Sequence, residues 1–117
     1  MTIGLVLDCT DPDRLAEFWA AALDYEIRGH EGAYVQLRPK GGPGPKLLLQ
    51  QVPEPKAGKN RMHIDLDLAT AGIDAEAARL EALGASRVAA EPYDELGMRW
   101  MLMADPEGNE FCVCEAC

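Results

Sequence analysis

The sequence predicts an α+β fold in which one plan, a strand followed by a helix and three further strands, occurs twice. The first observation is the repeat itself, because the order of strand and helix patterns in the first half recurs in the second. The second is a polar, proline-containing linker over 53–61, which separates a module over about 1–52 from a module over about 62–117. The third is length, because 117 residues fit a single domain with one core.

The composition is that of an acidic, globular chain. Apolar residues make up 48% and charged residues 26%, and eleven basic against twenty acidic residues give a net charge of −9. This charge argues against a nucleic-acid or anionic-membrane partner, because its field repels both. The longest unbroken apolar run, over 18–23, is far too short for a membrane span. The N-terminus has no basic start and reaches an acid at Asp8, so we expect no signal peptide and a cytoplasmic protein.

The four cysteines fit a reducing compartment. Three of them, Cys112, Cys114 and Cys117, crowd the end of the chain, whereas a secreted disulfide scaffold of this size spreads its cysteines out. The tail spacing C-x-C-x-x-C suggests a zinc site, but only Cys9 is available as a distant fourth ligand. We therefore expect ordinary thiols, without a structural zinc site or a bridge between Cys112 and Cys114.

The first module begins with an aliphatic run over 3–9 that is typical of a buried strand. Asp11 and Pro12 are the expected N-cap and first turn of a helix that ends near Asp24. Its apolar face, at i, i+3, i+4 and i+7, consists of Leu15, Phe18, Trp19 and Ala22, with the two aromatic residues as core anchors. Three strands are then expected over 25–29, 33–38 and 46–52.

The second module repeats this order after the linker. A strand is expected over 62–68, followed by Thr70 as the candidate N-cap of a helix that Gly84 closes. The expected apolar face of this helix consists of Ile73, Ala77 and Leu80. Further strands are expected over 86–90, 98–104 and 110–115. The last two are joined by a tight turn over 105–109, in which Gly108 suits positive φ.

Three motifs occur in the order that one known fold requires. They are DPDRLAEFW at 11–19 in the first helix, MHIDL at 62–66 and the terminal hairpin DPEGNEF at 105–111. Together with VPEPK at 52–56, they resemble the vicinal oxygen chelate superfamily of glyoxalase I, bleomycin resistance proteins and extradiol dioxygenases, most closely its small bacterial glyoxalase-like domain group. The resemblance covers nearly the whole chain. It implies two βαβββ modules in a cup-shaped fold, a homodimer, and a small-molecule ligand in the cavity between the curved sheets.

Within that fold, strand alternation assigns residues to the helix side or to the cavity side of each sheet. The residues expected on the helix side are Ile3, Leu5, Leu7, Ile64, Leu66, Leu68, Phe111 and Val113. Those expected on the cavity side are Gly4, Val6, Asp8, His63, Asp65, Asp67, Glu110, Cys112 and Cys114. Trp100, Met101 and Met103 are expected in the core or in dimer packing. The predicted ligand-binding cavity contains His63, Asp65, Glu110 and Cys112, together with Gln50, the residue that the resemblance places at the cavity position of the fourth strand.

The resemblance also implies where a metal would bind, because metal-dependent members take ligands from the first, fourth, fifth and last strands. Carried over to this chain, these positions are Gly4, Gln50, His63 and Cys112. Glu110 is a further candidate ligand on the face of Cys112. Gly4 has no side chain, and an amide, an imidazole and a thiol are an odd set for a catalytic divalent ion, so we expect no metal cofactor. The iron site of extradiol dioxygenases is not expected, because the second histidine, His30, falls in a turn.

The sequence leaves more than one function open. We expect a protein that binds a small organic molecule in its cavity without a catalytic metal. The alternative is a divalent-metal-dependent lyase, isomerase or group transferase of the glyoxalase type that uses His63, and a third reading is an accessory domain without a ligand. His63 and Asp65 would form an acid–base pair if the cavity were closed. The basic cluster, which either solvates the linker or holds an anionic substrate group, consists of Lys56, Lys59 and Arg61.

Overall fold

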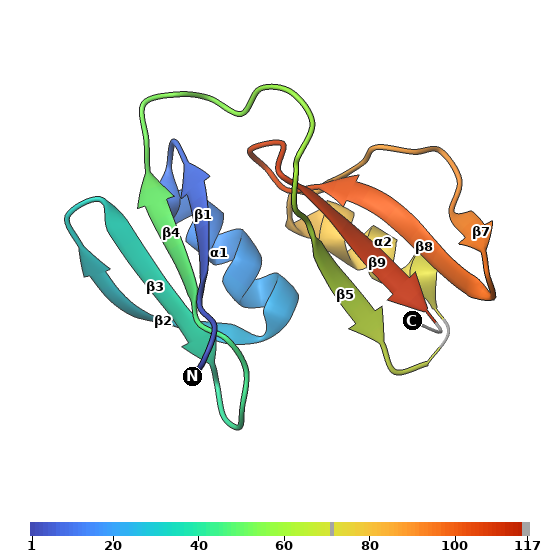
Figure 1. Ribbon diagram of the computed structural model, residues 1–117, viewed down its shortest axis with the longest axis horizontal. Coiled ribbons are helices and arrows are strands. Elements are labelled where there is room, and N and C mark those ends of the chain that lie inside the picture. The colour runs from blue at the N-terminus through green and yellow to red at the C-terminus, as the bar shows by residue number, and fades with distance from the viewer. Residues whose placement is uncertain (71, 116–117) are drawn as a thin grey trace. The chain divides into compact units, whose positions relative to one another are not determined.

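A helix packed on one face of a sheet is the plan of both units of the chain, Met1–Lys56 and Ala57–Cys117 (Figure 1). The computed structural model describes residues 1–70 and 72–115. Unit 1 follows the predicted order of elements, although its second strand runs through His30, which was expected in a turn. Unit 2 adds one short strand to the predicted plan. The predicted α+β fold is therefore confirmed. Neither helix in the described part of the chain has the length and apolar character needed to cross a membrane.

Unit 1 is a four-stranded sheet covered by one helix. Its elements are β1 (Leu5–Cys9), α1 (Pro12–Leu23), β2 (Tyr25–Glu31), β3 (Tyr34–Pro39) and β4 (Leu47–Gln51). The strand order is β1-β4-β3-β2, in which only β1 and β4 run parallel. The Asp11 carboxylate accepts a hydrogen bond from the backbone N–H of Arg14 at 3.2 Å, and the helix closes at Asp24 in the left-handed conformation. Both ends of α1 are where the sequence predicts them.

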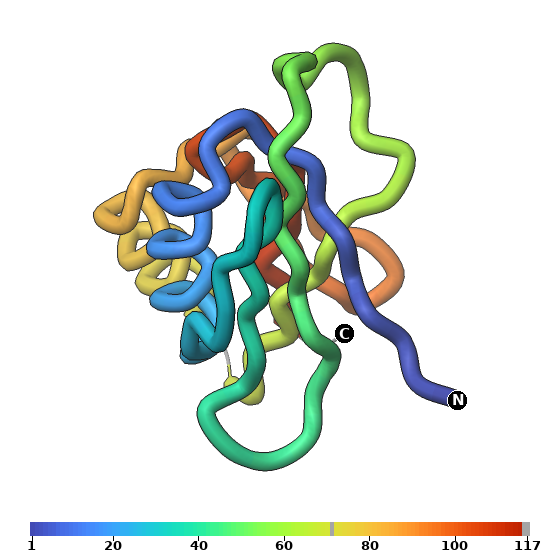
Figure 2. The backbone as a smooth tube through the Cα atoms, turned by 90° about the vertical axis from the view of Figure 1, so that its left-hand side faces the viewer, coloured from blue at the N-terminus to red at the C-terminus, as the bar shows by residue number. Residues whose placement is uncertain are grey.

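The core of unit 1 is anchored by two aromatic side chains from α1, which lies to one side of the sheet (Figure 2). Trp19 and Phe18 are almost fully buried, and their rings meet edge to face with centroids 5.1 Å apart. Ile3, in contrast, was expected in the core and is 75% exposed. The reason is that β1 pairs with β4 only from Leu5 onward, so the chain before it has no strand partner that would fix its inward face.

Unit 2 has a five-stranded sheet. Its elements are β5 (Ile64–Leu68), α2 (Ile73–Leu83), β6 (Ser86–Arg87), β7 (Tyr93–Glu95), β8 (Met98–Ala104) and β9 (Glu110–Glu115). The strand order is β5-β9-β8-β6, with β7 also paired to β8, and β5 and β9 run parallel. The strand predicted over 86–90 is shorter than expected, and β7 was not predicted. Pro92 stands between the two short strands and cannot donate a backbone hydrogen bond to a ladder.

The N-terminus of helix α2 is capped by a residue that is distant in sequence. Thr70 is not its N-cap: the helix begins at Ile73, after Gly72. The Glu115 carboxylate, at the end of β9, accepts hydrogen bonds from the backbone N–H groups of Gly72 at 2.8 Å and Ile73 at 3.1 Å. These bonds, with a smaller contribution from Arg99, hold the pKa of Glu115 below its usual value.

The turn before β9 matches its prediction. The Asp105 carboxylate accepts hydrogen bonds from the backbone N–H groups of Glu107 at 2.9 Å and Asn109 at 3.0 Å. Gly108 has φ of 87°, a left-handed conformation that favours glycine. The turn thus fixes the point at which β9 starts, and with it the register of the residues that follow.

Candidate functional site

The sheet face of unit 2 that points away from α2 carries its reactive side chains. Phe111 and Val113 on β9 are fully buried on the helix side, as predicted. Asp65 on β5 pairs with Cys112 on the parallel strand β9. Because side chains alternate along both strands, Asp65 and Cys112 lie side by side on the opposite face. We call this the outer face of unit 2, and it includes His63, Asp65, Trp100, Cys112 and Cys114.

A pocket of about 330 Å³ opens on this outer face. Its lining consists of His63, Asp65, Met98, Trp100, Cys112 and Cys114. Trp100 on β8 pairs with Cys114 on β9 and stacks on Tyr93 of β7, with ring centroids 5.6 Å apart. Three of the five predicted cavity residues therefore share one pocket, together with an aromatic ring whose position is fixed by a neighbouring ring.

Sequence reasoning missed the contribution of β8 to this pocket. Trp100 was expected in the core or in dimer packing together with Met101 and Met103. Both methionines are indeed fully buried, whereas Met98 and Trp100 line the pocket. Alternation along 98–104 was the signal that could have separated them, because Trp100 is one residue out of step with the two buried methionines.

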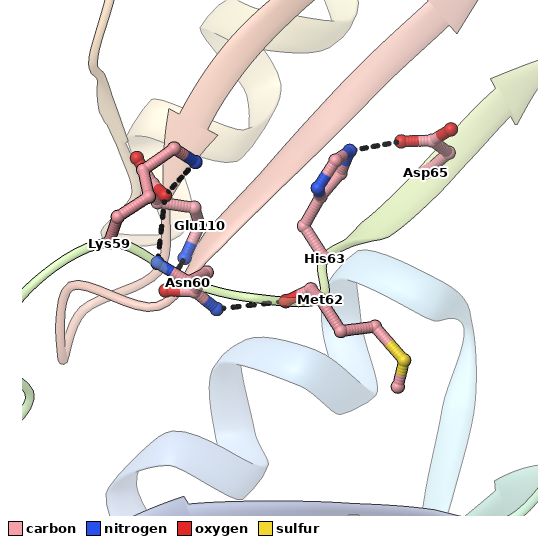
Figure 3. A network of polar contacts seen from close by, with 6 residues as sticks. All are labelled: Lys59, Asn60, Met62, His63, Asp65 and Glu110. Carbon is pink, nitrogen blue, oxygen red and sulfur yellow. Dashed lines mark hydrogen bonds and ion pairs between the residues drawn. The ribbon is translucent and has the colours of Figure 1, made fainter.

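His63 lies one residue before β5, and its imidazole points toward Asp65 (Figure 3). The His63 Nε2 and Asp65 Oδ1 atoms are 3.3 Å apart, and the two side chains are 44% and 51% exposed. The pair therefore stands at the solvent-accessible edge of the pocket. A histidine whose Nε2 is held by a carboxylate presents its other ring nitrogen for a ligand or a proton.

A polar network ties the segment before His63 to the start of β9 (Figure 3). The Asn60 side chain accepts a hydrogen bond from the Glu110 N–H at 3.3 Å and donates one to the Met62 carbonyl at 3.2 Å. The Glu110 carboxylate accepts the Asn60 N–H at 3.3 Å and forms an ion pair with Lys59. Because Glu110 is two residues from Cys112 on β9, this network positions His63 beside the thiol.

Cys112 is a buried, protonated thiol. Burial first, and then the negative charge of Asp65, raise the pKa of Cys112 to about 11. At neutral pH the group is therefore not a thiolate nucleophile in the protein alone. Cys9 and Cys112 keep their thiols, whereas Cys114 is disulfide-bonded, so the expectation of an ordinary thiol was wrong at that position. Cys117, the remaining member of the tail pattern, lies outside the described residues.

Two further predicted cavity residues do not line this pocket. Glu110 is engaged by Lys59 and Asn60, and its side chain is only 13% exposed. Gln50 belongs to β4 of unit 1, where it pairs with Asp8 and Tyr34. That Gln50 faces the same ligand as the residues of unit 2 stays a prediction, as does a cavity between the two sheets.

The donor atoms present do not fit the four-strand metal site that the resemblance implies. Gly4 offers no donor, and a Cβ at this position would lie 2.7 Å from Cε of Lys46. A different group does come together: donor atoms of His63, Asp65 and Cys112 all lie within 4.8 Å of one another. Among the residues described, no other cluster of three histidine, cysteine or acidic side chains has this geometry.

Solved structures with the same architecture are numerous. A glyoxalase/bleomycin resistance protein/dioxygenase family enzyme from Burkholderia phytofirmans is 14% identical with a TM-score of 0.80, covering 97% of this chain and 96% of its own. The fosfomycin resistance protein FosX from Listeria monocytogenes is 14% identical with a TM-score of 0.79, covering 100% and 93%. A glyoxalase/bleomycin resistance protein/dioxygenase from Nocardioides is 22% identical with a TM-score of 0.77, covering 98% and 83%. At these identities the likeness concerns the fold.

Sequence comparison identifies the family directly. Among curated proteins, none matches the sequence significantly. The family model of the glyoxalase-like domain, however, matches residues 4–114, which include all three motifs and most of both units. The chain therefore belongs to the glyoxalase-like domain family, within the vicinal oxygen chelate superfamily.

Proposed function

We propose that the protein binds a small organic molecule in the outer-face pocket of unit 2, without the four-strand metal of the superfamily. The observation that carries the proposal is the pocket itself, in which an aromatic ring and buried sulfur atoms form an apolar lining beside the polar pair His63 and Asp65. Its volume of about 330 Å³ suits a small ligand. An apolar lining with a few polar groups is the usual composition of such sites.

The charges around the pocket favour a neutral or cationic ligand. Unit 2 carries twelve acidic and five basic residues, and Asp65 places a carboxylate at the pocket edge. Lys59, a candidate from the basic cluster for holding an anion, is already paired with Glu110. A protonated amine in the pocket would be attracted by the charge of Asp65 and would lie near the ring of Trp100.

Intrinsic tryptophan fluorescence tests this proposal, because Trp100 lines the pocket whereas Trp19 is buried in unit 1. Arylalkylamines and arylalkyl carboxylates of matched size should be titrated into the protein in the presence of a metal chelator. We expect the amines to change the fluorescence and to bind more tightly than the carboxylates. The change should be lost in Trp100→Phe and weakened in Asp65→Asn. Equal responses from the wild type and Trp100→Phe would show that the pocket is not the binding site.

The enzymatic alternative rests on the His63–Asp65 contact. The 3.3 Å separation lets His63 act as a proton acceptor or donor that Asp65 orients. The four-strand metal has no part in this alternative, because Gly4 supplies no ligand to that site. Turnover of a bound compound that His63→Gln abolishes, while the Trp100 fluorescence response to that compound persists, would establish this alternative.

Two expectations from the sequence, of which the first is implied by the resemblance, remain predictions. One is the homodimer, which light scattering coupled to gel filtration would test through the mass of the particle. The other is a cytoplasmic location, which fractionation of the source cells would test. The proposed pocket lies within one unit, so ligand binding as proposed here depends on neither of them.

A further inference from the structure

We propose that His63, Asp65 and Cys112 bind a divalent cation of the zinc class at a site confined to unit 2. The three donor atoms lie within 4.8 Å of one another, and they come from β5, β9 and the residue just before β5. The site differs from the four-strand arrangement, because it needs no residue of unit 1 and because Asp65 supplies a ligand. The inference goes beyond organic-ligand binding and does not depend on it, and because both use Asp65, the cation and a protonated amine would compete for the pocket.

The spacing suits a tetrahedral ion. With bonds of about 2.0–2.3 Å to nitrogen, oxygen and sulfur, a tetrahedral ion holds its ligand atoms about 3.3–3.8 Å apart. The His63 Nε2 and Asp65 Oδ1 atoms are already 3.3 Å apart. The distances from the Cys112 sulfur to the other two donor atoms exceed that range by at most about 1 Å, since no two donor atoms are more than 4.8 Å apart. Small side-chain rotations of the half-exposed His63 and Asp65 are enough to close this difference.

The donor chemistry selects the kind of cation. One thiolate, one carboxylate and one neutral imidazole balance a divalent charge, and the proton of the thiol leaves to solvent on binding. Imidazole and thiolate ligands suit Zn²⁺ and its spectroscopic substitutes Co²⁺ and Cd²⁺, whereas Mg²⁺ and Mn²⁺ prefer oxygen donors in octahedral geometry. Three protein ligands leave a fourth position open to the pocket, as in zinc sites that bind a water or a substrate.

Access and electrostatics support the same reading. His63 and Asp65 are about half exposed, so a hydrated ion can reach them from solvent before it contacts the buried Cys112. The excess of acidic residues in unit 2 gives that unit a net charge of −7, whose field attracts cations. The polar network of Asn60 and Glu110 holds the backbone before His63 in place, which reduces the rearrangement that binding requires.

Titration with Co²⁺ alone tests the proposal. The protein should carry Cys114→Ser and Cys117→Ser so that tail sulfurs cannot bind the ion, and no organic ligand should be present. We expect one Co²⁺ per chain, with a near-ultraviolet sulfur-to-metal charge-transfer band that Zn²⁺ abolishes by displacement. Mg²⁺ should not displace Co²⁺. The absence of a charge-transfer band at saturating Co²⁺ would overturn the proposal.

The chain provides matched controls for each ligand. Cys112→Ser should remove the charge-transfer band, whereas Cys9→Ser, which changes the other buried thiol outside a disulfide, should keep it. His63→Asn and Asp65→Asn should weaken Co²⁺ binding about ten-fold or more, and His30→Asn should not. Asp65→Asn changes a half-exposed side chain, so it tests the site even if Cys112→Ser fails to fold. Equal binding by Asp65→Asn and His30→Asn would overturn the proposal.

The two proposals fail separately. The cation is measured without an organic ligand, and the arylalkylamines are measured with a chelator. Loss of the cobalt band with an intact Trp100 response would reject the cation site alone, and the reverse result would reject only the organic-ligand site.

Discussion

The two units build the same strand-helix arrangement and place different chemistry on it. In each unit a five-residue strand precedes the helix and runs parallel to a later strand. Three positions are equivalent: the residue before this strand, its second residue, and the residue paired with that second residue. They hold Gly4, Val6 and Leu48 in unit 1 and His63, Asp65 and Cys112 in unit 2. At these three positions, side chains that can bind a cation or transfer a proton are therefore present in unit 2 only.

This difference shows that the fold and the site use separate sets of positions. The helix side of each sheet is apolar in both units, because the helix must be packed there. The opposite face packs against no helix of its own unit, so the fold constrains the residue types there less than on the helix side. The helices differ as well: α1 buries Phe18 and Trp19, whereas α2 buries only aliphatic residues and receives its large partners, such as Phe111, from the sheet.

The largest expected effect comes from the helix cores. Trp19→Ala should destabilise the protein by about 3–5 kcal/mol, because it removes a buried aromatic ring that contacts Phe18. Ile73→Ala in α2 should cost about 2–4 kcal/mol, because the side chain is smaller. Denaturant unfolding monitored by circular dichroism measures both. A larger loss for Ile73→Ala would reverse the comparison between the two helices.

A smaller effect is expected in the turns. Gly108→Val should cost about 1–3 kcal/mol, because valine strongly disfavours the φ of 87° that the turn before β9 requires. Gly42 of unit 1 also has positive φ, at 77°, but nothing lies within 4 Å of a Cβ there and the surrounding loop is exposed. Gly42→Val is the matched control and should cost less. Equal shifts in thermal midpoint would show that the Asp105 hydrogen bonds do not hold the turn rigid.

The cap of α2 should make the stability of the protein depend on pH. Since the folded-state pKa of Glu115 is lowered, its contribution to stability is present above the ordinary pKa of a glutamate and is lost as pH falls through the folded value. Glu115→Gln should therefore lower the thermal midpoint at neutral pH and flatten its acid dependence. Asp11→Ala in unit 1 should cost about 1 kcal/mol, because it removes a local cap. An unchanged acid profile in Glu115→Gln would contradict the assignment of Glu115 as the cap of α2.

Local patterns were enough to predict most of the fold, and contacts distant in sequence account for what they missed. Three features depend only on residues that are close in sequence, and all three match the structure: the periodicity of α1, the cap at Asp11 and the 105–109 turn. The prediction of Thr70 as the N-cap was wrong, because Glu115, more than forty residues away in sequence, accepts the hydrogen bonds from the start of α2. The prediction that Ile3 is buried was wrong, because the apolar character of a residue does not show where strand pairing begins.

The candidate site was predictable to the same extent. Alternation correctly placed Asp65 and Cys112 on one face, because each lies within a strand of known phase. The engagement of Glu110 by Lys59 and Asn60 could not be predicted, because it depends on the path of the linker. Trp100 was missed because aromatic residues on a central strand are usually core, and only its phase relative to Met101 and Met103 distinguishes it.

The smallest expected effect on stability comes from giving unit 2 the residue of unit 1 at the second strand position. Asp65→Val should change the free energy of unfolding by only about 0.5 kcal/mol, because the side chain is half exposed and valine favours strands.

The same Asp65→Val change should lower the pKa of Cys112 from about 11, because Asp65 raises it both by its charge and by a hydrogen bond. The pKa should stay above the ordinary value of a thiol, since burial is the largest cause of the shift. The rate of Cys112 alkylation by iodoacetamide, followed by mass spectrometry across a pH series, measures the change, with Val6→Asp in unit 1 as the control that leaves it unaltered. If the inflection for Cys112 stayed in place in Asp65→Val, the carboxylate would not act on the thiol, and the outer face of unit 2 would lack the coupling that distinguishes it from unit 1.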